Sequence, residues 1–174
     1  CIVACGGAAN RNAQSIPKAG DMPEGGDWTG VFYSPTYGYL HLVKDGTTAA
    51  GKWRNTAGDK WGELHGEVTG NLLNFEWQET EIGMVGPSAK KSGRGYFQYV
   101  KMPGNVADEI HGQWGLDSEA TGVSWNAVKQ RNMKPDPDSV VPDETQKVEG
   151  GGWDQSKKKS SGGGDKSDTS DGWN

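Results

Sequence analysis

The sequence predicts an all-β protein, and specifically an antiparallel, eight-stranded up-and-down meander barrel. Apolar residues and glycines alternate with polar residues in eight short segments between residues 28 and 132, and turn residues separate these segments. A helical period does not persist for three turns anywhere in this region. Eight strands that are apolar on one side can bury that side by curling until the first pairs with the last, which also removes both exposed edges.

Each expected strand is justified by its own alternation. In chain order, the strands are expected at residues 28–34, 37–44, 47–55, 61–69, 72–79, 94–101, 108–116 and 122–130. In the same order, the inward-facing residues are Trp28, Gly30 and Phe32; Gly38, Leu40 and Leu42; Ala49, Gly51 and Trp53; Leu64, Gly66 and Val68; Leu73, Phe75 and Trp77; Gly95, Phe97 and Tyr99; Ile110, Gly112, Trp114 and Leu116; and Val123, Trp125 and Ala127. The alternate positions are mostly polar, so each strand has one dry and one wet face.

Glycine alternates with large aromatic residues on the dry face. This pattern fits a small barrel, because a large side chain needs an empty site opposite it and glycine permits sharp coiling of a strand. Two packed sheets remain an alternative, since a local pattern does not distinguish a closed barrel from a sandwich.

The two flanks have a different composition from the 28–132 domain. Residues 1–27 are rich in Ala, Asn, Gly, Gln and Pro without a period, which predicts an anchor followed by a flexible linker. Residues 133–174 are rich in Gly, Ser, Asp and Lys and predict a disordered tail. Within this tail, Trp153 and Trp173 are either aromatic anchors on another surface or part of a solvated spacer.

Charge and composition exclude several classes of partner. The chain has 174 residues, with 18 Lys and Arg against 23 Asp and Glu, for a net charge of -5. This balance, without a dense basic stripe, leaves little counterion-release energy for binding nucleic acid. No apolar run approaches the roughly 20 residues that span a bilayer.

Tryptophans are expected to gather at one end of the barrel. In a meander the odd-numbered connections share one end, and three of them, residues 56–60, 80–93 and 117–121, are long. Trp53, Trp77 and Trp125 should converge beneath these loops, with Trp114 somewhat deeper. Such an aromatic cup either binds a small apolar or aromatic ligand or plugs the barrel as packed core.

The barrel resembles the avidins and lipocalins, which are small ligand-binding barrels. The resemblance rests on Gly26-Asp27-Trp28 with Ser34, on Gln113-Trp114-Gly115-Leu116, and on Ser124-Trp125-Asn126. It implies an eight-stranded barrel with aromatic residues at its mouth. It does not imply biotin as the ligand, because Gly30 stands where avidins place an asparagine and no carboxylate follows Trp125 at the expected distance.

The titratable residues predict neither an enzyme nor a metal or cofactor site. His41, His65 and His111 all fall on the wet face, and His65 and His111 lie on strands that are not neighbours. We therefore interpret all three as solvated surface histidines. The chain has no HExxH, P-loop, GxSxG or CxxC motif and no inward carboxylate pair.

An apolar cluster is expected on the outside of the first two strands. Its members are Val31, Tyr33, Tyr37, Tyr39 and Val43. Clustered aromatic residues on an outer face favour an interface, either for self-association or for docking to a larger envelope complex, whereas scattered surface tyrosines would need no explanation. We favour an assembly or accessory module over a ligand carrier, because no inward polar group is expected that could select a ligand.

The first residues, Cys1-Ile2-Val3-Ala4-Cys5-Gly6-Gly7, resemble the start of a mature bacterial lipoprotein. The resemblance implies that Cys1 is lipidated and tethers the chain to the cell envelope, with the outer membrane as the expected address and the barrel periplasmic or surface-exposed. Lipidation of Cys5 is the alternative, and an arbitrary boundary with disulfide-bonded or free cysteines is a third interpretation.

Overall fold

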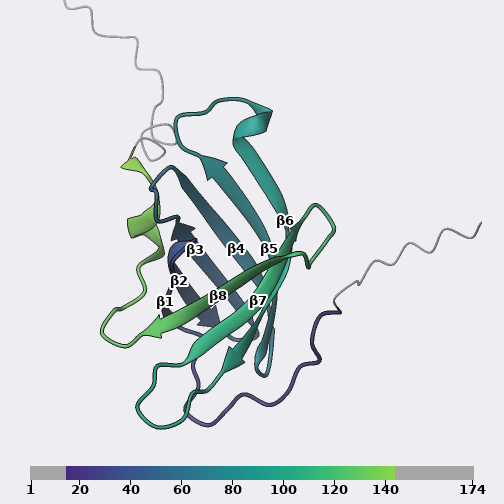
Figure 1. Ribbon diagram of the computed structural model, residues 1–174, viewed down its shortest axis with the longest axis vertical. Helices are drawn as coiled ribbons and strands as arrows, with labels where there is room; N and C mark the ends of the chain where they lie inside the picture. Colours follow the sequence, from purple (N-terminus) through teal and green to yellow (C-terminus); the bar gives the residue numbers. More distant parts are fainter. Residues whose placement is uncertain (1–14, 144–174) are drawn as a thin grey trace, which may run out of the picture.

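The strands close into the expected barrel. The computed structural model describes residues 15–143, and its eight antiparallel strands are hydrogen-bonded in the order β1-β2-β3-β4-β5-β6-β7-β8 around a closed barrel (Figure 1). Their bounds are β1 Gly30–Ser34, β2 Gly38–Asp45, β3 Thr48–Arg54, β4 Lys60–Thr69, β5 Leu72–Glu81, β6 Lys90–Val100, β7 Glu109–Leu116 and β8 Val123–Gln130. Two short 3-10 helices, η1 Pro87–Ala89 and η2 Pro137–Val140, complete the regular structure of the described residues. The sandwich alternative is therefore wrong.

Closure depends on a short seam between the first and last strands. Only three pairs join β1 to β8, namely Val31 with Gln130, Phe32 with Lys129 and Tyr33 with Val128. The β5–β6 ladder extends beyond the predicted strands at residues 72–79 and 94–101. Its additional pairs include Glu79 with Lys91 and Thr80 with Lys90. Cross-strand pairs of opposite charge stabilise a ladder beyond its apolar part.

The dry face forms one core inside the barrel. Phe32, Leu42, Leu73, Phe97 and Ile110 are each 0% exposed, and the aromatic rings from β3, β5, β6 and β8 meet between them. The alternation in the sequence therefore identified most of the buried face correctly, but Leu116 and Val123, which were predicted to face inward, are 50% and 44% exposed. We call the end of the barrel that carries the β1–β2, β3–β4, β5–β6 and β7–β8 connections the loop end.

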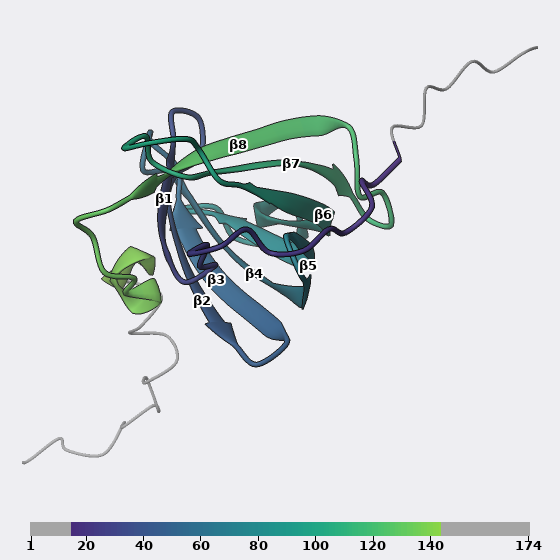
Figure 2. The same cartoon turned by 90° about the horizontal axis from the view of Figure 1, so that it is seen from below.

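The segment before β1 lies against the opposite end of the barrel (Figure 2). Gly20 donates its N–H to Asn71 Oδ1 at 2.8 Å and accepts the N–H of Asn71 at 3.0 Å. Met22 packs against the core, and the Trp28 indole donates to the Gly70 carbonyl at 3.1 Å. Residues 20–27 are thus part of the folded domain, and their assignment to a flexible linker was wrong.

The segment after β8 crosses the outer wall of the barrel, where it includes η2 (Figures 1 and 2). We call residues 131–143 the strap. Its Asp136 N–H donates to His41 Nδ1 on β2 at 2.9 Å, and its Asp138 forms an ion pair with Lys52 on β3 at 2.9 Å. The predicted disordered tail therefore begins too early, because the strap is packed on the barrel. Trp153, Trp173, Cys1 and Cys5 lie outside the described residues.

Candidate functional site

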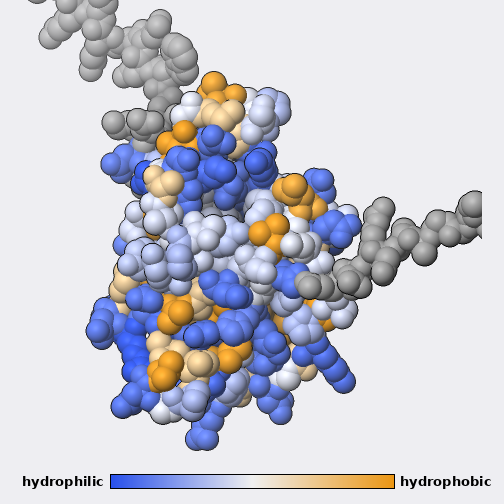
Figure 3. Space-filling view, in the orientation of Figure 1, coloured by the Kyte–Doolittle hydropathy of each residue, from blue (hydrophilic) through white to orange (hydrophobic). Residues whose placement is uncertain are grey.

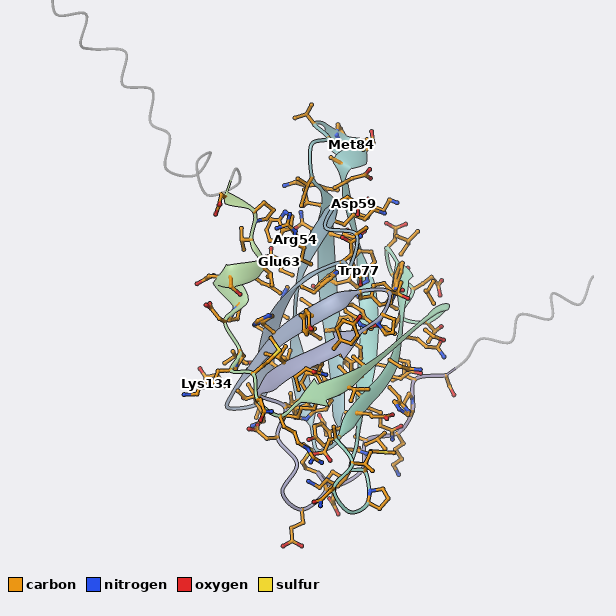
Figure 4. All side chains as sticks on the ribbon, turned by 60° about the vertical axis from the view of Figure 1, so that its left-hand side comes forward. Arg54, Asp59, Glu63, Trp77, Met84 and Lys134 are labelled. Carbon is orange, nitrogen blue, oxygen red and sulfur yellow. The ribbon has the colours of Figure 1, made fainter. Side chains whose placement is uncertain are left out.

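The four predicted tryptophans come together near the loop end. Trp53 and Trp125 meet across the barrel in a T-shaped pair with ring centroids 5.0 Å apart, and Trp77 and Trp114 form a second such pair at 4.9 Å. Figure 4 shows Trp77 on the inner side of the strands. Trp53 and Trp125 are 2% exposed, whereas Trp114 is only partly buried, so the expectation that Trp114 lies deeper was wrong.

Tyr37 joins these two tryptophan pairs, and its prediction as an outward interface residue was wrong. Its ring centroid lies 4.5 Å from that of Trp125, and its hydroxyl accepts the Trp114 indole N–H at 2.9 Å. Tyr37 lies in the β1–β2 turn and not in β2, and the following Gly38 has a φ of 69°. A left-handed residue breaks the two-residue alternation, so parity could not place this side chain.

Around the tryptophan pairs, the polar groups that face the interior are uncharged indole N–H donors. The Trp77 indole N–H donates to the Gly115 and Arg94 carbonyls at 3.1 and 3.2 Å. The indole N–H groups of Trp53 and Trp125 are buried and have no hydrogen-bond acceptor among the described residues. An edge-to-face ring pair can satisfy an N–H only weakly, and a buried donor without an acceptor costs about 1–3 kcal/mol.

A polar cluster that the alternation pattern did not predict closes the opposite end of the barrel. Tyr99 donates its hydroxyl to Asp108 Oδ2 at 2.6 Å, and Lys101 pairs with the same oxygen at 3.2 Å. Burial alone would raise the pKa of Asp108, but the hydrogen bonds from Tyr99 and Lys101 and the charge of Lys101 lower it below its usual value. Burial, and then the bond to Asp108, raise the pKa of Tyr99.

Lys129 belongs to the same end of the barrel. It falls on the inward-facing side of β8 by the two-residue alternation, and this position was the sequence feature that could have identified it. Its ammonium group lies over the rings of Phe32 and Tyr99, 5.6 and 5.8 Å from their centroids, and donates to the Asp27 carbonyl. Burial lowers the pKa of Lys129, while Asp27 and Asp108 act in the opposite direction. This lysine fastens residue 27 to the barrel and completes the closure of that end.

The outer wall carries a cross-strand row of apolar side chains. Tyr39 on β2 lies opposite Tyr33 on β1, which in turn lies opposite Val128 on β8. The two tyrosine rings are 4.9 Å apart, and Tyr39 and Val128 are 43% and 39% exposed. We call Tyr39, Tyr33 and Val128 the tyrosine row. Elsewhere, as on the face in Figure 3, apolar residues occur in small groups among polar ones.

The strap alters the predicted outer cluster. Val31 lies opposite His41 in the β1–β2 ladder and is 0% exposed, so its prediction as an accessible interface residue was wrong. Val43 remains 39% exposed. A groove of about 520 Å³ lies between the tyrosine row and the strap, and its lining includes Met133 and Val140 of the strap. The strap therefore replaces part of the predicted surface with a concave one.

The three histidines have different environments. His65 and His111 are exposed and approach Glu76 and Glu109 at 3.9 and 2.6 Å, respectively. His41 is only 7% exposed, and its prediction as a solvated histidine was wrong because the strap covers it. Burial lowers the pKa of His41, and the charge of Asp136 partly offsets this effect.

Comparisons with protein-family models, with curated proteins and with solved structures found no match. Between residues 15 and 143, no group of three or more His, Cys, Asp or Glu side chains is placed to hold a metal ion. The same residues contain no helix with the length and apolar character needed to cross a membrane. Function must therefore be inferred from the side chains themselves.

Proposed function

We propose that this protein is a non-enzymatic envelope lipoprotein whose barrel self-associates through the tyrosine row. The observation that carries the proposal is the unbroken cross-strand series Tyr39, Tyr33 and Val128 on the outer wall, in which Tyr39 and Val128 are exposed and Tyr33 is partly exposed. Contiguous exposed apolar residues favour contact with another protein, and tyrosine is enriched at the energetic centres of interfaces.

The proposed partner is a second copy of the chain. A closed barrel has no free strand edge in its ring, so association has to use side chains on the wall. With a two-fold axis through Tyr33, Tyr33 of one copy would contact Tyr33 of the other, and Tyr39 of each copy would contact Val128 of the other. Arg54 lies opposite Tyr39 on β3, and Glu109 lies opposite Val128 on β7, so the rims that approach each other carry opposite charges.

A lipid anchor at Cys1 would favour this association. Tethering to one membrane surface raises the effective concentration of the barrels relative to one another. An interface with modest intrinsic affinity would then suffice in the outer membrane. Trp153 and Trp173 remain candidate contacts outside the barrel, and docking to a different envelope protein is the competing outcome.

Replacing Tyr33 and Tyr39 with serine should convert a dimer into a monomer. Each tyrosine is expected to contribute about 2 kcal/mol, so together they should change the dissociation constant by roughly 1,000-fold. Analytical ultracentrifugation over a concentration series measures this change. Because a cross-strand pair contributes only about 0.2–1 kcal/mol to folding, thermal unfolding should show that the variant remains folded.

The matched control replaces Val85 and Val106 with serine, because both are exposed apolar residues but lie in loops away from the row. This control should remain dimeric. A separate Tyr33→Cys variant should form an intermolecular disulfide between two copies of residue 33, identified by peptide mapping. A wild-type chain that stays monomeric at every concentration, or that is captured only by a different protein, would overturn self-association.

Binding of a small ligand at the loop end is a second candidate, favoured by the unpaired N–H groups of Trp53 and Trp125. These donors are inward polar groups, which the alternation pattern did not predict. The uncharged rings around them suit a neutral, planar molecule with hydrogen-bond acceptors. Such a ligand would have to displace Tyr37, which now covers Trp125.

The ligand candidate predicts a saturable change in tryptophan fluorescence with a panel of neutral heteroaromatic carbonyl compounds. The change should be lost in Trp53→Phe, which keeps a ring but removes the donor. Trp28→Phe is the control, since its indole N–H already bonds to Gly70 at the other end of the barrel. Equal responses in the two variants would argue against a site at Trp53.

A further inference from the structure

The strap crosses the wall directly beside the tyrosine row. His41 and Val31 form the next pair of outward residues along β2 and β1 after Tyr39 and Tyr33, and both are buried. Met133 and Val140 of the strap line the groove whose other wall includes Tyr33 and Tyr39. The position of the strap therefore determines whether this groove exists. Figure 4 shows the strap rising along the side of the barrel from Lys134.

The strap is fastened by a hydrogen bond that depends on the protonation of His41. Its Nδ1 accepts the backbone N–H of Asp136 at 2.9 Å, so this nitrogen must carry its lone pair and the ring must be neutral. An imidazolium has N–H groups on both nitrogens and cannot accept this bond. Protonation would leave a partly buried backbone N–H facing another donor.

We infer that the strap forms one wall of the docking groove and dissociates from the barrel at acidic pH, when protonation of His41 breaks its hydrogen bond to Asp136. This inference rests on the proposed self-association and adds its regulation. At neutral pH the strap is closed and the groove is complete. At mildly acidic pH the strap leaves the wall, so Met133 and Val140 no longer line the groove and charged His41 is exposed on each copy. Both changes weaken the dimer.

Other charged groups around His41 do not remove this effect. Asp136 and Asp138 approach from the strap, and Lys52 and Arg54 lie on the adjacent strand β3. Tyr39 on β2 and Tyr33 on β1 line the same groove as His41. Two carboxylates thus face two cations, and Asp138 is already paired with Lys52 at 2.9 Å. Asp136 attracts an imidazolium, but burial of the ring is the larger influence on its pKa.

The sign of the pH dependence follows from the direction of the shift. The pKa of His41 is lowered in the closed form, relative to an ordinary value of 6.5 that applies once the strap is released. Closure is therefore fully favoured above 6.5 and loses free energy as the pH falls from 6.5 through the lowered pKa of the closed form. The midpoint of release should lie below that ordinary value.

NMR of the full chain from about pH 8 to about pH 5 tests this inference, because histidines titrate in this range. The heteronuclear NOE of amides 133–143 should fall on acidification, and amide exchange at Asp136, corrected for the intrinsic pH effect, should accelerate by about tenfold or more. The ring carbon shifts of His41 should titrate with the same midpoint. A strap that keeps its order across the range, or a midpoint unrelated to His41, would overturn the proposal.

His41→Asn is the decisive variant. Its Oδ1 can take the place of Nδ1 as acceptor and does not protonate in this range, so the strap should remain ordered at about pH 5. His65→Asn is the matched control, since His65 is exposed on β4, and should release the strap as the wild type does. Loss of the pH effect in both variants, or in neither, would contradict a role for His41.

The outcome for the strap is separable from the outcome for the dimer. Strap release is measured on amides and on the His41 ring and needs no partner. If the strap is released in a chain that never dimerises, self-association is refuted, but the proposed role of His41 in holding the strap still stands. A dimer whose dissociation constant does not change with pH, while the strap is released, would refute its role as a wall of the groove.

Discussion

Replacing Trp125 with alanine is expected to lower the free energy of unfolding by about 3–5 kcal/mol, the usual range for removing a large aromatic side chain from a core. Its ring contacts Trp53, Phe75, Phe97 and Tyr37, with centroid distances from 4.5 to 6.4 Å. These residues come from four different parts of the barrel, so they cannot collapse together into the space that Trp125 leaves.

Urea denaturation followed by far-UV circular dichroism measures this loss, and the near-UV aromatic signal should also decrease. The control is Val123→Ala, because Val123 lies on the same strand and is 44% exposed. A substitution at such a position should change stability by no more than about 0.5 kcal/mol. Similar effects of the two substitutions would show that Trp125 is not the centre of the core.

Replacing Gly66 with alanine should destabilise the barrel by roughly 3 kcal/mol, at the upper end of the range for overpacking. A methyl group at this position would overlap the Asn74 carbonyl oxygen and lie 2.6 Å from the Phe75 Cα, and both are main-chain atoms of the neighbouring strand β5. Main-chain atoms cannot rotate away as a flexible side chain can. Accommodation therefore requires β4 and β5 to separate in the middle of their ladder.

Gly20→Ala provides the same chemical change without the clash, because its nearest neighbour would be the Asn71 side chain at 3.4 Å, an ordinary contact. We expect a change within about 0.5 kcal/mol for this control. Thermal unfolding of the two variants in parallel is sufficient. Equal stability of Gly66→Ala and wild type would mean that the sharp coiling of β4 at Gly66 does not need glycine.

The alternation of side chains predicted the barrel wall well, because strand parity is a local property. Leu64, Phe97 and Trp125 each have their orientation fixed by a two-residue repeat, independently of distant parts of the chain. Strand parity did not place Tyr37 correctly, because this residue lies in a turn before the left-handed Gly38. It also failed to identify Lys129, because a lysine at an inward position reads as an exception until its partners are known.

The candidate docking site could be predicted only in part. Tyr33 and Tyr39 were placed on the outer wall correctly, since β1 and β2 are adjacent in a meander. Val128 was missed as their neighbour, because it joins them only through the seam that closes the barrel. His41 was assigned to solvent because the strap that bonds to it has no periodic apolar pattern, and Val31 was assigned to an accessible interface although it is 0% exposed.

The amino-acid sequence alone was sufficient to predict most of the inward-facing residues, the antiparallel meander, and the gathering of Trp53, Trp77, Trp114 and Trp125 near one end. These properties follow from short-range alternation and from the order of the strands along the chain. The accessible part of the outer wall and the burial of His41 depend instead on long-range packing. The reason is that the bond between His41 and Asp136 joins residues 95 positions apart, and no local pattern encodes such a contact.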